Sequence, residues 1–82
     1  MYKIIIIAEP QKKIVINLID LDKEVIVNRT TTYQPQLIDC LKSLVNTQEV
    51  NQISVCGPKV YTTKIANDMK EQFPQAEVEE IN

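Results

Sequence analysis

The spacing of apolar residues changes along the chain in a fixed order, from three strand-like runs to alternating helix and strand. Residues 2–8 are mostly apolar without alternation, which predicts a central strand with apolar side chains on both of its faces. Residues 13–21 and 25–32 are β-branched runs joined by polar turn residues, which predicts a hairpin. The polar second half of 25–32 is typical of a strand exposed at a sheet edge.

The second half of the chain shows helical spacing twice. A first apolar stripe predicts a helix over residues 35–46, with Pro35 in its first turn. A short strand follows over 53–55. Residues that recur every four positions predict the inner face of a second helix, which Pro74 ends, and a last strand over 76–81. The first stripe consists of Leu37, Ile38, Leu41, Leu44 and Val45, and the second of Tyr61, Ile65, Met69 and Phe73.

The element order is therefore βββαβαβ, in one domain of residues 1–82. This order resembles the core of the ribonuclease-H-like and actin-like folds, over nearly the whole chain but without a family motif. The resemblance implies a two-layer α/β protein with a five-stranded mixed sheet. Its strand order would be 3-2-1-4-5, with the first, fourth and fifth strands parallel and two helices on one face.

The nucleases of the ribonuclease-H-like fold need several carboxylates that converge on their metal ions. Glu9 stands near the end of the first strand, where that family carries an aspartate, and Asp68 lies on the second helix. The end of the fourth strand carries no acid. The catalytic carboxylate set that the resemblance implies is therefore incomplete.

The actin-like enzymes bind phosphates with glycine-rich loops after the first strand. This chain has residues 9–13, Glu-Pro-Gln-Lys-Lys, at that position, and only one glycine in all. The resemblance leaves enzyme activity open, but the missing residues favour a non-enzymatic protein. We expect no catalytic residue, no metal and no cofactor.

Charge and composition restrict the partners. The net charge is −2 with a single arginine, Arg29, so nucleic acid is an unlikely partner. The apolar run at residues 4–8 is too short to span a membrane, and no segment has the pattern of a secretory signal.

Cys40 and Cys56, without any histidine, are interpreted as free thiols in a reducing compartment. We expect a cytoplasmic protein, and the lysine-, isoleucine- and asparagine-rich composition suggests a bacterial or phage source.

One segment indicates ligand binding. Gly57 and Lys59 follow the fourth strand, and Thr62 and Thr63 lie in the first turns of the second helix. Helix N-termini and the carboxyl ends of parallel strands attract anions, so a small anionic ligand or a nucleic-acid phosphate is one hypothesis. The other is structural: Gly57 shapes the turn and a threonine caps the helix.

The leading functional hypothesis concerns the sheet. Both crossovers run in the same direction, so right-handed connections place both helices on one face and leave the other uncovered. An apolar patch there predicts a protein-interaction or regulatory module, with a homodimer as the expected assembly and a different protein as the alternative partner. Long Lys or Glu side chains covering the patch of a monomer, or a one-residue slip exchanging the two faces, stay open. The expected interface residues are Ile5, Ile7, Val15, Ile19 and Val27.

Overall fold

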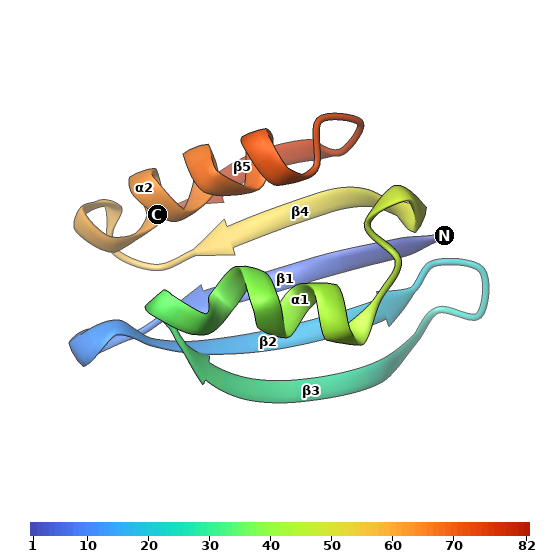
Figure 1. The fold of residues 1–82 in the computed structure, drawn as a ribbon, viewed down its shortest axis with the longest axis horizontal. Coiled ribbons are helices and arrows are strands. Elements are labelled where there is room, and N and C mark those ends of the chain that lie inside the picture. The colour runs from blue at the N-terminus through green and yellow to red at the C-terminus, as the bar shows by residue number, and fades with distance from the viewer.

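A computed structural model describes residues 1–82 as one five-stranded sheet with two α-helices and three short 3₁₀ turns (Figure 1). The strands are β1 (Tyr2–Ala8), β2 (Lys13–Asp20), β3 (Val25–Tyr33), β4 (Val50–Cys56) and β5 (Glu77–Ile81). The helices are α1 (Leu37–Leu44) and α2 (Lys59–Gln72), and the 3₁₀ turns are η1 (Pro10–Lys12), η2 (Gln34–Gln36) and η3 (Thr47–Glu49).

The strand order is β3-β2-β1-β4-β5, as predicted. β1 pairs with β2 and β2 with β3 in antiparallel ladders, whereas β1 and β4, and β4 and β5, run parallel. α2 joins the parallel strands β4 and β5, α1 carries the chain from β3 across to β4, and the antiparallel pairs are joined by short turns. The α/β class, the sheet order and the strand directions expected from the sequence are all confirmed.

Both helices pack on the same face of the sheet, here called the covered face (Figure 1). Alternate residues of the inner strands, such as Ile4 and Ile6 of β1, are fully buried beneath them. Leu41 of α1 and Met69 of α2 belong to the same apolar cluster as these strand residues. Burying a large aliphatic side chain stabilises a fold by about 1.5–3 kcal/mol, so this single layer supplies most of the favourable free energy.

The first helix is shorter than predicted. Pro35 belongs to the 3₁₀ turn η2, and α1 begins only at Leu37. At the other end Val45 is already extended, and the Asn46 side chain accepts a hydrogen bond from Gln48 N–H at 3.0 Å. Asparagine favours such local caps over a helix interior, so Asn46 opens the next turn and α1 ends before it.

The second helix ends just before Pro74, as predicted, but one residue of its predicted inner face was wrong. Ile65, Met69 and Phe73 are buried as expected. Tyr61 is 36% exposed, and Thr62 is fully buried in its place. Residues 62, 65, 66 and 69 follow the i, i+3, i+4, i+7 spacing of one helix face, and an i, i+4 series alone drifts away from that face.

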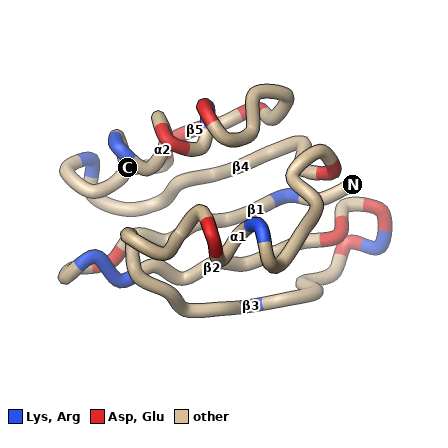
Figure 2. The backbone as a smooth tube through the Cα atoms, viewed as in Figure 1, with Lys and Arg blue, Asp and Glu red and all other residues tan.

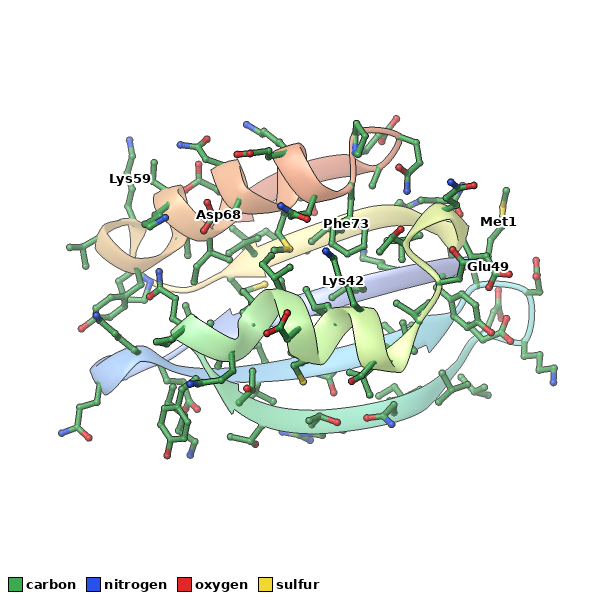
Figure 3. All side chains as sticks on the ribbon, in the orientation of Figure 1. Met1, Lys42, Glu49, Lys59, Asp68 and Phe73 are labelled. Atoms are coloured by element: carbon green, nitrogen blue, oxygen red, sulfur yellow. The ribbon has the colours of Figure 1, made fainter.

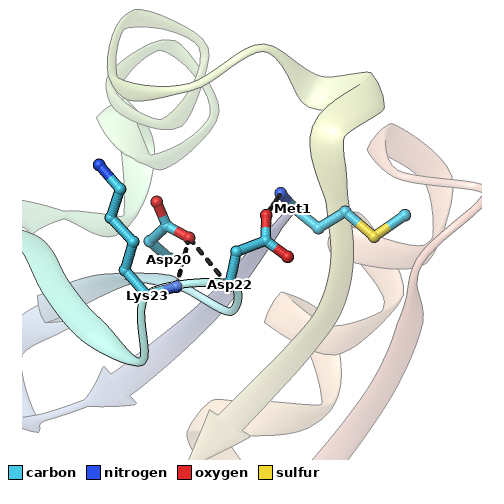
Figure 4. Close-up of polar contacts among 4 residues, drawn as sticks. All are labelled: Met1, Asp20, Asp22 and Lys23. Atoms are coloured by element: carbon cyan, nitrogen blue, oxygen red, sulfur yellow. Dashed lines mark hydrogen bonds and ion pairs between the residues drawn. The ribbon is translucent and has the colours of Figure 1, made fainter.

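The hairpin turn between β2 and β3 is held by Asp20 (Figure 4). Its Oδ1 accepts the backbone N–H groups of Lys23 at 3.2 Å and Asp22 at 2.9 Å. The Lys23 bond is the largest influence and lowers the pKa of the Asp20 carboxyl. Desolvation opposes it, and the Asp22 bond and the nearby Lys23 and N-terminal charges lower the pKa further. Glu24 completes the turn with a left-handed φ of 57°.

Candidate functional site

The face of the sheet opposite the helices, here called the open face, has no segment above it (Figure 1). The residues that alternate with the core residues of the strands lie on it, because successive side chains of a strand point to opposite faces. They include two buried polar residues, Asn17 and Ser54, on either side of Ile5. The cross-strand pairing connects five of these residues into one row across the whole sheet. In order from β3 to β5, this open-face row consists of Thr31, Val15, Ile7, Cys56 and Ile81.

The residues expected at an interface fall largely on the open face. Ile5 and Ile7 of β1 and Val15 and Ile19 of β2 occupy the positions between the buried ones, and all four are half-buried. Val27 sits in a bulge of β3, where the register against β2 shifts between Leu18 and Ile19. The structure therefore places four of the five on one surface and Val27 at the adjacent edge.

More large apolar side chains are exposed on β3 than on any other strand or helix, and they lie at the sheet edge rather than at the centre of the open face. Val25, Ile26, Val27 and Tyr33 have exposed fractions of 47%, 61%, 47% and 54%. These are four of the eight large apolar residues exposed anywhere in the protein. The exposed apolar surface is thus concentrated on one edge strand.

The two edges of the sheet differ in charge (Figure 2). β3 carries one charged residue, Arg29, in nine. The five residues of β5 include Glu77, Glu79 and Glu80. Charged side chains on an edge discourage pairing with another strand, whereas a long, nearly neutral edge presents unpaired backbone groups that favour it.

At the junction of β4 and α2, Gly57 has a structural reason to be glycine. Its φ is +139°, and a Cβ at this position would lie 2.8 Å from the backbone oxygen of Ala8. Any other residue would be both strained and in a steric clash with β1. This accounts for Gly57 without a ligand.

Thr62 and Thr63 of the same junction donate to a carboxylate of the chain itself. Thr62 Oγ1 and Thr63 Oγ1 lie 2.8 and 3.1 Å from Glu80 Oε1. The Asn82 side chain donates to Thr62 Oγ1 at 2.8 Å and to the Gly57 carbonyl at 3.0 Å. The hydroxyls that would hold an anion are therefore used by Glu80, and its negative charge lies at the place proposed for the ligand.

Three lysines on this side of the chain, Lys12, Lys59 and Lys64, do not converge on one anion site. Lys59 is exposed at the start of α2 and points away from the protein (Figure 3). Lys12 and Lys64 line a separate shallow depression together with Asp68. Lys64 Nζ forms an ion pair with Asp68 Oδ2 at 3.2 Å, which neutralises part of the positive charge there.

Glu9 and Asp68, the acids relevant to a nuclease, lie apart in separate ion pairs. Glu9 Oε1 is 3.8 Å from Lys13 Nζ, and Asp68 is paired with Lys64. No three Cys, Asp or Glu side chains gather in a way that could hold a metal ion. Cys40 packs against the core from α1, Cys56 ends β4 on the open face, and both thiols are free.

The sequence analysis assigned no role at this junction to Glu80 or Asn82, although both hydrogen-bond to Thr62. Their contacts with Thr62 join positions 18 and 20 residues apart. Those contacts depend on the register of β5 against β4, which places Glu80 beside Val55 on the covered face. The only signal in the sequence is the alternation of β5, in which Glu80 shares a face with Val78.

Neither helix is long and apolar enough to cross a membrane. Comparison of the chain with protein-family models, with curated proteins and with solved structures finds no match in any of the three. Functional inference for this protein therefore begins from the open face and the β3 edge.

Proposed function

We propose that this protein is a small non-enzymatic interaction or regulatory module of the cytoplasm, which associates through the open face of its sheet and the β3 edge. The observation that supports the proposal is the edge strand itself. β3 is nine residues long, carries one charge and exposes four large apolar side chains. Unprotected edges of this kind are rare in monomeric proteins, because they pair with other strands.

The open face extends the same surface inwards from the edge. Ile7 and Val15 continue the row that begins at Thr31 of β3. They are half-buried, so a partner that contacts β3 gains further apolar contact on this face. An apolar surface that continues across several strands is typical of protein interaction sites.

Binding of an anion near Lys59 is the alternative function, and the local contacts support it less. Glu80 takes the hydroxyl donors of Thr62 and Thr63, and the glycine is required by the approach of Ala8. A negative ligand would have to displace a carboxylate that is already hydrogen-bonded there. The interaction module needs no such rearrangement.

Multi-angle light scattering after size exclusion, over a concentration series, tests the proposal. A mass that rises from 9.4 kDa towards twice this value is expected, and Val27→Lys should shift the transition to higher concentration. Val60→Lys is the matched control, because Val60 is 84% exposed on α2, away from the sheet. A wild-type protein that stays at 9.4 kDa, or a Val60→Lys effect equal to that of Val27→Lys, would contradict the proposal.

A further inference from the structure

We infer that the partner is a second copy of this chain and that the two copies pair β3 with β3 in antiparallel orientation, around a two-fold axis at Thr31. This inference rests on the proposed function and specifies its partner and geometry. Two five-stranded sheets would then join into one continuous sheet of ten strands. The alternation of hydrogen-bonded and non-bonded pairs in the antiparallel ladders determines which backbone groups of β3 are free.

Two backbone hydrogen bonds show which pairs of β1 and β2 are the hydrogen-bonded ones. Leu21 N–H donates to Met1 O and Glu9 N–H donates to Lys13 O, both at 2.9 Å. The pairs Met1/Leu21 and Glu9/Lys13 lie just beyond the two ends of the β1–β2 ladder, and both are hydrogen-bonded pairs. Because such pairs alternate with non-bonded ones in an antiparallel ladder, the odd-numbered residues of β2 direct their backbone groups towards β1.

The even-numbered residues of β2 consequently direct their backbone groups towards β3. Ile14, Ile16 and Leu18 are the partners of Thr32, Thr30 and Asn28. Arg29 and Thr31 lie between these three β3 residues and Tyr33 follows them, so their backbone groups point in the opposite direction. The backbone groups of Arg29, Thr31 and Tyr33 thus point away from the sheet, and no segment of the chain lies beyond them (Figure 1).

These three outward-facing residues are spaced symmetrically about Thr31. A two-fold axis there places Thr31 opposite its own copy and Arg29 opposite Tyr33 of the second copy. The Thr31 pair exchanges two N–H···O bonds, and each Tyr33 N–H can donate to the Arg29 carbonyl of the other copy, which gives about four bonds in all. The Tyr33 carbonyl itself begins the 3₁₀ turn η2. The pairable stretch ends where it must, at the Val27 bulge on one side and at Pro35, which has no N–H, on the other.

Charge selects this register over the nearest alternative. An axis at Arg29 would place the two Arg29 side chains directly opposite each other, and like charges at that position destabilise a sheet. The axis at Thr31 separates them by four residues and brings each guanidinium near the exposed Tyr33 ring of the other copy. Cation and aromatic ring attract at this range.

The same axis also makes the open-face row continuous. Thr31 begins the row that runs through Val15, Ile7 and Cys56 to Ile81. An axis perpendicular to the sheet keeps both open faces on the same side. The row of one copy then meets the row of the other at the Thr31 pair, where β-branched residues pack well across strands.

Thr31→Pro is the first test, because it removes an outward N–H and leaves the ladder to β2 intact. Proline is tolerated at edge positions of this kind. Thr31→Val, which keeps the N–H, is the matched control. Thr31→Pro is expected to show a mass of 9.4 kDa at concentrations where wild type and Thr31→Val show twice that value, with unchanged circular dichroism.

Cysteine cross-linking tests the register and does not depend on the proline variant folding. In a background with Cys40 and Cys56 replaced by alanine, Arg29→Cys and Tyr33→Cys chains are oxidised separately and as a mixture. Opposite residues of a bonded pair lie about 5.5 Å apart, within disulfide range, whereas identical positions lie about 14 Å apart along the strand. The mixture is expected to form covalent dimers at least about tenfold faster than either variant alone.

Three results would overturn this inference. A wild-type dimer that survives Thr31→Pro, with equal cross-linking in the mixture and in the single variants, would leave the proposed function standing and assign the contact to the open face. A mass that keeps rising with concentration would indicate head-to-tail pairing of β3 with β5. A wild-type monomer at all concentrations would overturn both the inference and the proposed function.

Discussion

Thr62 Oγ1 donates a hydrogen bond to Glu80 Oε1 at 2.8 Å, which ties the buried face of α2 to the edge strand β5. Thr62 is fully buried, so its hydroxyl has no access to water. Removing the acceptor from a buried donor costs about 1–3 kcal/mol. The contact is therefore structural, and it closes the C-terminal strand onto the helix.

Glu80→Ala should lower the free energy of unfolding by about 1–2 kcal/mol, because the Thr62 hydroxyl loses its acceptor. Urea denaturation followed by circular dichroism measures the change. Glu77→Ala is the matched control, since Glu77 is an exposed residue of the same strand, and should change stability by less than about 0.5 kcal/mol. Thr62→Val should recover part of the loss in the Glu80→Ala background, and equal effects of Glu77→Ala and Glu80→Ala would refute the assignment.

Inorganic phosphate should leave the melting temperature unchanged relative to sodium chloride of equal ionic strength. The donors at the start of α2 are used by Glu80, so no preformed anion site is free. A ligand present at 100 times its Kd would add about 2.7 kcal/mol, which is a shift of roughly 10 °C or more for a domain of this size. A rise of that order that disappears in Lys59→Glu would support the anion-binding alternative instead.

Gly57→Ala should destabilise the fold by at least about 2 kcal/mol through backbone strain and a clash at 2.8 Å with Ala8 O. Chemical denaturation provides the measurement. Ala8→Gly should not restore stability in the Gly57→Ala background, because the clashing atom is a backbone oxygen. Tolerance of Gly57→Ala would show that this junction is looser than its geometry indicates.

Glu24→Gly should raise stability by about 0.5–1 kcal/mol, because Glu24 adopts a φ of 57° that glycine reaches without strain. Thermal and urea denaturation of the variant check this. Lys23→Gly in the same turn is the matched control. Lys23 is not among the residues of positive φ, so glycine there only adds chain entropy and should lower stability.

Asp20→Asn should make the free energy of unfolding less dependent on pH in the acidic range. The folded pKa of Asp20 lies below its unfolded value, so its contribution is complete above about pH 4 to 5 and is lost as the pH falls through the folded pKa. The difference between wild type and Asp20→Asn should accordingly shrink below about pH 4. A difference that stays constant from pH 7 to pH 2 would show that the hairpin bonds do not depend on this charge.

Periodicity predicted most of the fold because each strand and helix has its own local pattern. β1 was predicted over residues 2–8, as observed, since its apolar run at residues 4–8 stops sharply at Glu9 and Pro10. The ends of α1 were missed because Pro35 and Asn46 fit both a helix and the 3₁₀ turns that the structure has. Tyr61 and Thr62 were exchanged because four-residue spacing does not follow one helix face over three turns.

The candidate site was predictable only where it depends on strand alternation. Ile5, Ile7, Val15 and Ile19 share a face because strands have a period of two, so the sequence identified them together. The contacts of Glu80 and Asn82 depend on long-range register, and the outward phase of Arg29, Thr31 and Tyr33 depends on which pairs of β1 and β2 are bonded. Neither property leaves a local signal in the chain.

The three glutamates of β5 determine how large the proposed assembly can become. Pairing two β3 strands consumes the only neutral edge of each molecule and leaves a β5 strand at both outer margins. Those margins carry the same negative charge, so further molecules are repelled at either end. An assembly of this kind would close at two copies instead of growing into a filament, and neutralising Glu77 and Glu79 is expected to let it polymerise.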